Sequence, residues 1–248
     1  MERTEWLKKM RTQAEALYDH LAPVYWVNFG SQPDPTELQF VMKFLRRMAP
    51  GSRLLQAGCG AGRYDALLAE AGHSVLGIDQ SACMLARARE MHPVERYPRL
   101  HYEKRGLQEM EFEGEFDGAT CIEAMEHIFP EDWPGIMLRF AAALKPGGLL
   151  YITVERADWT AVRNSYEKGK AQGLPLVFGE LVDELEAAYQ EVTSQQGSAI
   201  TGDRSDQAVY HYYPDPEKVQ EWFSEAGFGV EELGSGGWYE HFLLRKKD

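Results

Sequence analysis

A glycine-rich turn between two apolar runs constrains this chain more than any other segment. The first run enters GCGAG at residues 58–62, a helical pattern leaves it, and the second run ends at Asp79. Glycine lets the backbone turn tightly and brings a ligand close to main-chain N–H groups. An acid about 20 residues further on is placed to accept both hydroxyls of a ribose. The sequence therefore predicts an adenosine-containing ligand at the carboxyl edge of a parallel sheet.

Strand and helix patterns alternate around this turn. Apolar runs predict strands near residues 53–57, 74–79, 99–103, 116–122 and 149–155, and helical patterns lie near 61–71, 82–90 and 132–144. Alternation of this kind gives a parallel sheet with helices on both faces. A further helix begins at Asp215, and two last strands near 228–234 and 238–246 flank a glycine-rich turn. The expected fold class is α/β: a doubly wound, mostly parallel seven-stranded sheet with an antiparallel C-terminal hairpin strand.

The spacing of the turn separates two classes of adenosine ligand. A dinucleotide fingerprint has a third glycine where this chain has Arg63, whereas residues 58–62 follow a GxGxG spacing. GxGxG before an acid-ended second strand resembles the class I S-adenosylmethionine-dependent methyltransferases, whose ligand carries a methionine carboxylate and no pyrophosphate. Further segments resemble this family in order and spacing: YDHLAPVYW (18–26), FDGATCIEAMEHI (116–128), LKPGGLLYITVE (144–155), EWFSEAGF (221–228) and YEHFLLRK (239–246). The resemblance covers residues 14–155 and 210–247.

This resemblance implies S-adenosyl-L-methionine as the cofactor and assigns residues to its site. The cofactor-binding residues would be Tyr18, Gln56, Ala57, Gly58, Cys59, Gly60, Asp79, Gln80, Met84, Leu107, Gln108 and Glu123. Asp79 would bind the ribose, Tyr18 the methionine carboxylate and Met84 the adenine face, with core packing as the alternative for Tyr18 and Met84. The chain departs from the family at Gln56, where an acid is usual, and at Gly106, where an acid often lies near the adenine amino group.

Two further clusters carry groups suited to the acceptor side. Glu123, Glu126 and His127 form ExxEH after the fourth strand, which resembles ubiquinone-pathway O-methyltransferases; a related arrangement binds a divalent metal in small-RNA 3′-end methyltransferases. We expect no metal here and assign His127 as the candidate general base, with a structural role as the alternative. In YHYYP at 210–214, Tyr210, His211 and Tyr213 are candidate walls of a substrate pocket, with simple packing as the alternative.

The chain divides into four expected parts. Residues 1–50 form an N-terminal helical cap, 51–155 the cofactor-binding core, 156–210 an insertion, and 211–248 the C-terminal part of the core sheet. In the cap, Asp34 and Glu37 are spaced as a capping box for a helix with the apolar face Leu38, Val41, Leu45 and Met48. The insertion has a polar amphipathic pattern at 181–192 and follows a core strand, so we expect a lid over the acceptor pocket. The alternative is a solvated insertion without function.

Composition limits the partners and the compartment. The net charge of −13 disfavours a nucleic-acid substrate, which would require a basic footprint. No run of about 18 apolar residues occurs, and the start lacks the apolar core of a signal peptide. The three cysteines (Cys59, Cys83 and Cys121) have no paired spacing, so we expect reduced, buried thiols in a cytoplasmic protein.

Together these observations predict an S-adenosylmethionine-dependent methyltransferase that acts on a small-molecule acceptor. Two alternatives stay open. Gln56 and Gly106 are compatible with a noncatalytic cofactor-binding or interaction protein, whereas a nicotinamide-dependent oxidoreductase is disfavoured by Arg63 at the third-glycine position. The methyl acceptor, the methylated atom and the oligomeric state are not determined by these residues.

Overall fold

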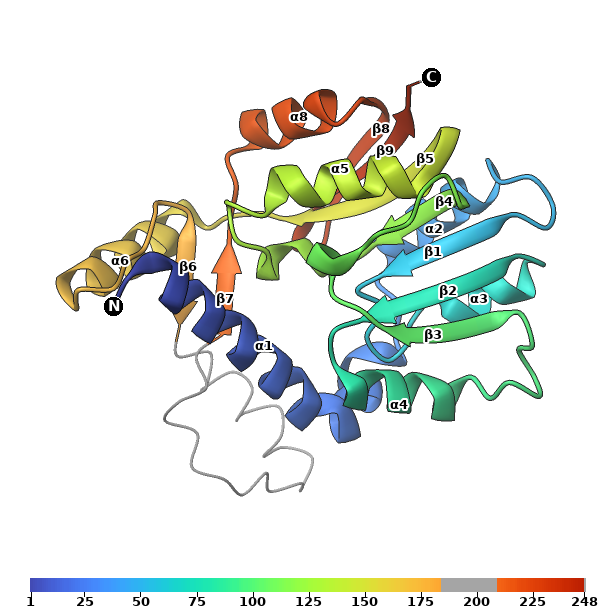
Figure 1. Cartoon of the computed structure of the whole chain (residues 1–248), viewed down its shortest axis with the longest axis horizontal. Coiled ribbons are helices and arrows are strands. Elements are labelled where there is room, and N and C mark those ends of the chain that lie inside the picture. The colour runs from blue at the N-terminus through green and yellow to red at the C-terminus, as the bar shows by residue number, and fades with distance from the viewer. Residues whose placement is uncertain (184–208, 248) are drawn as a thin grey trace.

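The core of the computed structural model, which describes residues 1–183 and 209–247, is a twisted seven-stranded sheet (Figure 1). Its strands are β1 (Arg53–Ala57), β2 (Ser74–Asp79), β3 (Leu100–Lys104), β4 (Phe116–Cys121), β5 (Leu144–Glu155), β8 (Phe228–Gly236) and β9 (Tyr239–Lys246). They lie in the order β3-β2-β1-β4-β5-β9-β8. The strands β1 to β5 pair in parallel, and β9 is antiparallel to both of its neighbours. The predicted fold class is confirmed.

Helices cover both faces of this sheet because successive strand residues point to opposite faces. Leu54 of β1 packs in the cluster that α2 (Pro35–Leu45) and α3 (Asp65–Glu70) cover. Leu55, the next residue, packs in the cluster that α5 (Trp133–Ala143) and α8 (Pro216–Glu225) cover. Figure 1 shows these two helices on one side of the sheet. The rings of Trp133 and Trp222 stack with their centroids 5.2 Å apart and join α5 to α8. The sheet is therefore buried on both sides, and its ligand-binding edge is the edge where the parallel strands end.

The N-terminal helix α1 (Arg3–Tyr25) runs past the carboxyl ends of these strands and continues into the short π-helical segment η1 (Trp26–Gly30) (Figure 1). It packs on α4 (Ala82–Met91). Asp19 of α1 accepts hydrogen bonds from Ser81 Oγ at 2.5 Å and from the Cys83 N–H at 3.1 Å. These bonds attach the helix to the start of α4, directly after Asp79. Short 3₁₀ segments, η2 (Leu107–Glu109) and η3 (Met125–His127), complete this edge.

The described part of the insertion differs from the sequence expectation. It contains α6 (Trp159–Ala171) and a strand, β6 (Glu180–Asp183), which pairs antiparallel with β7 (Val209–Tyr212) beside α1. The helix predicted from residue 181 is wrong at its start, because residues 180–183 pair with β7. The rest of that helix and the remainder of the expected lid, residues 184–208, lie outside the described residues.

Two details of the predicted core are also corrected. Asp34 caps α2 as expected, but Glu37 does not reach back to complete a capping box; it is buried against the Tyr64 hydroxyl. Leu38 is 37% exposed, and the buried face of α2 consists of Phe40, Val41, Phe44 and Leu45. Cys59 and Cys121 are buried thiols as predicted, whereas Cys83 is exposed. Among the helices that the structure describes, none combines the length and apolar character needed to cross a membrane.

Candidate functional site

A cavity opens at the carboxyl ends of β1, β2 and β4, with α1 as its outer wall. Its empty volume is about 730 Å³, including space open to solvent, which is within the range of small-ligand sites. Helix α1 and four segments, which follow β1, β2, β3 and β4, line it: Arg11, Ala14, Tyr18, Tyr25, Gly58, Gly60, Asp79, Gln80, Met84, Arg105, Gly106, Leu107, Gln108, Glu123, Ala124, His127, Ile128 and Phe129. We call this space the main cavity. Most of the predicted cofactor-binding residues therefore meet in one place.

The glycine turn has the backbone geometry that its sequence predicted. Gly58 and Gly60 have φ angles of +67° and +53°, in the left-handed region that favours glycine. A Cβ atom on Gly58 would lie 2.7 Å from the Cβ of Ala124, so a side chain there would collide with the opposite wall. The Cys59 N–H donates to the Ile78 carbonyl at 3.0 Å and fixes the turn against β2. Main-chain atoms are thus exposed to the cavity where a side chain would otherwise lie.

Asp79 connects this turn with the following helix. Its carboxylate accepts hydrogen bonds from the Gly60 N–H at 2.9 Å and the Ser81 N–H at 2.8 Å. Burial raises the pKa of Asp79 above its ordinary value, against the opposing effect of these two hydrogen bonds. Ser81 Oγ in turn accepts from the Met84 N–H at 3.0 Å and caps α4. The carboxylate is therefore held in place before any ligand reaches it.

The remaining predicted cofactor residues occupy two environments. Met84 is 1% exposed and lines the main cavity together with Gln80, Leu107 and Gln108. Ala57 is fully buried at the end of β1 and does not line the main cavity.

A second, smaller cavity adjoins the first. Its empty volume is about 380 Å³, and we call it the arginine cavity because Arg63 lines it. It shares four lining residues with the main cavity: Tyr25, Gly58, Gly60 and Glu123. Gln56 and Cys59 line it as well, and Gln56 Oε1 is buried without a hydrogen-bond partner among the described residues.

Tyr18 and His127, which both line the main cavity, form a hydrogen-bonded pair. Tyr18 Oη lies 2.6 Å from His127 Nε2, and His127 Nδ1 lies 3.2 Å from the carbonyl oxygen of Tyr210. Because a carbonyl only accepts, the ring proton is assigned to Nδ1, and Nε2 accepts from Tyr18. Burial, with a smaller contribution from the neighbouring His211 ring, lowers the pKa of His127 to about 3. The predicted general base is thus a neutral ring, poorly suited to take a proton at pH 7.

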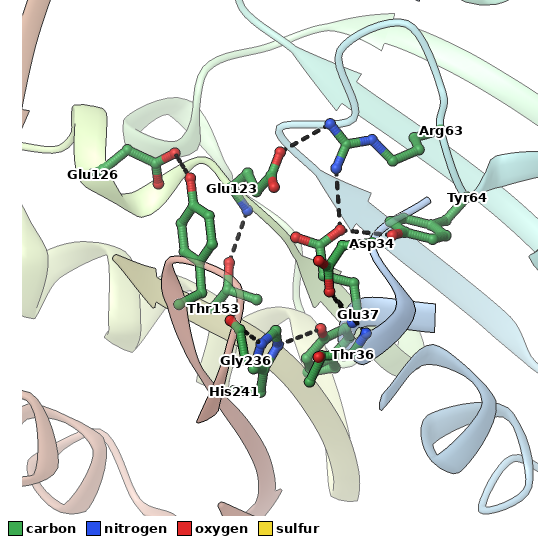
Figure 2. Close-up of polar contacts among 12 residues, drawn as sticks. Asp34, Thr36, Glu37, Arg63, Tyr64, Glu123, Glu126, Thr153, Gly236 and His241 are labelled. Carbon is green, nitrogen blue, oxygen red and sulfur yellow. Dashed lines mark hydrogen bonds and ion pairs between the residues drawn. The ribbon is translucent and has the colours of Figure 1, made fainter. Parts of the chain in front are cut away.

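The three residues of the ExxEH segment point in different directions. Glu123, with a φ of +49°, turns toward Arg63 and lies 2.9 Å from its Nη2 (Figure 2). Glu126 accepts from the Tyr239 hydroxyl at 3.0 Å, and its Oε1 lies 4.0 Å from His127 Nε2. Among the described residues, no group of three His, Cys, Asp or Glu side chains has the arrangement of a metal site.

None of the three candidate wall residues at 210–214 lines the main cavity itself, but Tyr210 and His211 contact Phe129 and His127, which do, so the substrate wall stays a prediction. Tyr210 is 3% exposed; its hydroxyl donates to Glu180 at 2.7 Å, and its ring packs edge-on against Phe129 at 4.6 Å. The His211 ring contacts that of His127 at 4.9 Å, and Tyr213 Oη lies 3.2 Å from His211 Nδ1. Tyr210 and His211 therefore contact His127 through a backbone carbonyl and a ring, and the pairing of β7 with β6 fixes their orientation.

Sequence reasoning missed part of the α1 wall. Arg11 and Ala14 line the main cavity with Tyr18 and Tyr25, at helical spacings of three, four and seven residues. The signal was the periodicity of the helix read outward from Tyr18. Phe129 and Arg105 were missed too, and neither carries a motif.

Comparisons with known proteins agree with this geometry. Residues 54–148 match a family model described as a methyltransferase domain. A ubiquinone biosynthesis O-methyltransferase of Xanthomonas axonopodis pv. citri (strain 306) is 32% identical over 239 residues, covering 92% of this chain and 84% of that protein. Its counterpart in Xanthomonas campestris pv. campestris (strain B100) is also 32% identical, over 140 residues; that match covers 54% of this chain and about half of the relative's length, 56%.

A solved structure shows the same fold. The 1,6-didemethyltoxoflavin-N1-methyltransferase of Burkholderia thailandensis, with bound 1,6-didemethyltoxoflavin and S-adenosylhomocysteine, superposes with a TM-score of 0.63. It is 18% identical, and the superposition covers 100% of this chain and 92% of that one. With the 32% identity over nearly the whole chain, the chain belongs to the class I S-adenosylmethionine-dependent methyltransferase family, and S-adenosylmethionine is its cofactor.

Proposed function

We propose that this protein transfers a methyl group from S-adenosylmethionine to an oxygen atom of a small-molecule acceptor. The observation that carries the proposal is the main cavity, which contains both Asp79 with the glycine turn and the pair Tyr18–His127. Donor-binding and acceptor-side groups therefore share one space of about 730 Å³. The name of the Xanthomonas relatives, ubiquinone biosynthesis O-methyltransferase, supports oxygen as the methylated atom.

The residues present fit the cofactor. Gly58 and Gly60 present main-chain atoms to the cavity, and a Cβ atom on Gly58 would collide with Ala124 at 2.7 Å. Asp79 presents a carboxylate to accept the ribose hydroxyls, and Met84 lies beside it for the adenine. Gln56 Oε1 is a buried acceptor without a partner among the described residues, and it lines the adjoining arginine cavity. Gln56 can thus accept a hydrogen bond although it replaces the usual acid.

The chemistry demands positioning more than acid–base catalysis. When bound, S-adenosylmethionine supplies an electrophilic methyl carbon on a sulfonium. The chain's part is to hold the acceptor oxygen in line and to exclude water, for which Ile128 and Phe129 provide an apolar wall. Tyr18 Oη donates to His127 Nε2 and has acceptor capacity for the acceptor hydroxyl. We propose that this pair orients the acceptor O–H, with the imidazole neutral throughout.

Turnover tests the proposal directly. Conversion of S-adenosylmethionine to S-adenosylhomocysteine is followed against a panel of small hydroxylated, amino and carbon acids, and the product's methylated atom is located by mass spectrometry and NMR. We expect an O-methyl product with the wild type and a large loss with Asp79→Ala. A product methylated on nitrogen or carbon would overturn the oxygen assignment. S-adenosylhomocysteine binding without turnover would favour a noncatalytic protein, and NAD binding without S-adenosylhomocysteine binding an oxidoreductase.

A further inference from the structure

Arg63 lies in the arginine cavity between two carboxyl groups. Its Nη1 is 3.1 Å from Glu37 Oε2, and its Nη2 is 2.9 Å from Glu123 Oε2. Figure 2 shows both carboxyl groups directed at this guanidinium from different parts of the chain. The Arg63 side chain is 14% exposed, so its charge is largely removed from water. Arg63 is therefore a buried guanidinium paired with two carboxyl groups, and not a solvated surface charge.

Glu37 is the unusual member of this group. It lies in the first turn of α2, outside the segment that matches the methyltransferase family model, and its side chain is 1% exposed. The Tyr64 hydroxyl donates to its Oε2 at 2.6 Å, whereas its Oε1 is buried without a hydrogen-bond partner among the described residues. Glu37 performs no capping, since Asp34 already accepts from the N–H groups of Thr36 and Glu37. Burying this carboxyl costs desolvation free energy, and the contacts it makes in return are those to Arg63 and the Tyr64 hydroxyl.

The charges around Glu37 determine its protonation. Burial and the nearby carboxyl of Glu123 raise the pKa of Glu37 to about 8. The titratable groups that interact with it are Arg63 and Tyr64 beside the glycine turn, Glu123 after β4 and Tyr151 of β5. Glu37 is therefore shifted toward its neutral form, which leaves Arg63 and Glu123 as the oppositely charged pair of side chains that line the arginine cavity.

One guanidinium and one carboxylate match one zwitterion. Arg63 and Glu123 both line the arginine cavity, and Glu123 also lines the main cavity beside Gly58. A ligand with its ribose at Asp79 would extend past the glycine turn into this cavity. Its far end must then offer a carboxylate to Arg63 and a cation to Glu123. An α-amino acid group has both charges on one carbon.

We propose that Glu37 is a positioning residue that holds Arg63 so that Arg63 and Glu123 bind the carboxylate and ammonium of the amino-acid end of S-adenosylmethionine. This inference rests on the proposed function. It assigns the carboxylate to Arg63 in place of Tyr18, whose hydroxyl is hydrogen-bonded to His127. Glu37 acts from α2 without touching the ligand: its Oε2 accepts from Arg63 Nη1 and the Tyr64 hydroxyl, and Arg63 Nη2 lies against Glu123. A guanidinium has five N–H donors, so those not used by these two carboxyl groups can bind the ligand carboxylate beside Glu123.

Two ligands that share the adenosine separate this role from general folding effects. S-adenosylhomocysteine has the amino-acid end, and 5′-methylthioadenosine lacks it. Calorimetry with the full-length protein should show that Arg63→Gln weakens S-adenosylhomocysteine binding by about tenfold or more, as expected for a lost charge-assisted hydrogen bond, and leaves 5′-methylthioadenosine binding within about twofold. Glu37→Ala should show the same selective loss. Glu37→Gln, which keeps a neutral acceptor of the same shape, should restore S-adenosylhomocysteine affinity to within about threefold of the wild type at pH 7.

The outcomes distinguish the inference from the function on which it rests. If the wild type binds neither ligand, the proposed function fails. If the wild type binds both but the Arg63 and Glu37 variants lose both ligands equally, or neither, the positioning role is overturned. Where Glu37→Ala does not fold, the pH profile decides: above pH 8 an ionised Glu37 competes for Arg63. The wild type should then lose S-adenosylhomocysteine affinity faster than Glu37→Gln, and identical profiles would refute the inference.

Discussion

Replacing Asp79 by alanine should weaken cofactor binding more than any other single truncation at the ribose end of the main cavity. The carboxylate lies at the end of β2 and lines the cavity, where its position is fixed by the N–H groups of Gly60 and Ser81. A ribose offers two hydroxyl donors to such an acceptor. In Asp79→Ala both ribose donors lose a charged partner, and the glycine turn loses its connection to α4.

The magnitude follows from the kind of bond that is lost. A hydrogen bond to a charged group contributes about 1.5–3 kcal/mol. At about 1.4 kcal/mol for each tenfold change, the dissociation constant for S-adenosylhomocysteine should rise by about 12- to 140-fold. Of the two backbone N–H groups that Asp79 leaves, that of Gly60 lines the cavity, where water can hydrate it, whereas Ser81 is buried. The cost in folding stability should therefore lie within the range of about 1–3 kcal/mol for an unsatisfied buried donor.

Isothermal titration calorimetry with S-adenosylhomocysteine measures the first effect, and chemical denaturation measures the second. Asp215→Ala is a matched control, because Asp215 likewise accepts from a backbone N–H, that of Glu217 at 2.8 Å, but lines neither cavity. It should lose about 1 kcal/mol of stability as a helix cap and bind the ligand normally. Unchanged affinity in a folded Asp79→Ala protein, or an equal loss in the control, would refute the ribose assignment.

Four further outcomes are expected. Activity should survive a chelator; abolition by EDTA and rescue by magnesium or manganese would contradict this. Tyr18→Phe and His127→Asn should each lower kcat by about tenfold or less, because a neutral His127 with a pKa of about 3 is no general base, and a loss of about 10²–10⁴ would show one. Glu180→Ala should lower the free energy of unfolding, measured by chemical denaturation, by about 3–5 kcal/mol, because the fully buried Glu180 carboxylate pairs with Arg3. Glu131→Ala removes an exposed partner of the same arginine and should lower it by less than about 1 kcal/mol. The pKa of Glu37 is raised to about 8. Its contribution to the free energy of unfolding is therefore fully present below the ordinary carboxyl pKa and is lost as the pH rises through 8. Melting temperatures measured from pH 5 to 9 should fall less in Glu37→Gln than in the wild type.

Local signals were sufficient for the fold and for predicting a set of residues most of which line one cavity. The strands 53–57 and 74–79 were predicted at their observed bounds, because short apolar runs between glycines have few alternative structures. The left-handed angles of the glycine turn follow from residues 58–62 alone, since only glycine adopts them without strain. The position of Asp79 follows from the end of its strand. Each of these features is encoded within one short segment.

The failed predictions depend on contacts between distant segments. Residue 181 begins a polar helical pattern, yet its segment forms a strand because β7 offers a pairing edge. The spacing of Glu37 from Asp34 is that of a capping box, yet burial against Tyr64 and Arg63 determines its orientation. In each case a tertiary partner overrides a local preference.

The same reasoning explains why the acceptor side was harder to predict than the donor side. The proposed donor contacts come mainly from backbone and from residues at strand ends, which the glycine turn and the acid fix locally. The proposed acceptor side combines Tyr18 of α1, His127 of η3 and the carbonyl of Tyr210 on β7, which are separated by 109 and 83 residues. The helix α1 reaches this position through Asp19, which accepts hydrogen bonds from the start of α4. We therefore predict that acceptor specificity depends on how α1 and β7 dock on the sheet, and that substitutions at Asp19 change acceptor turnover before they change the fold.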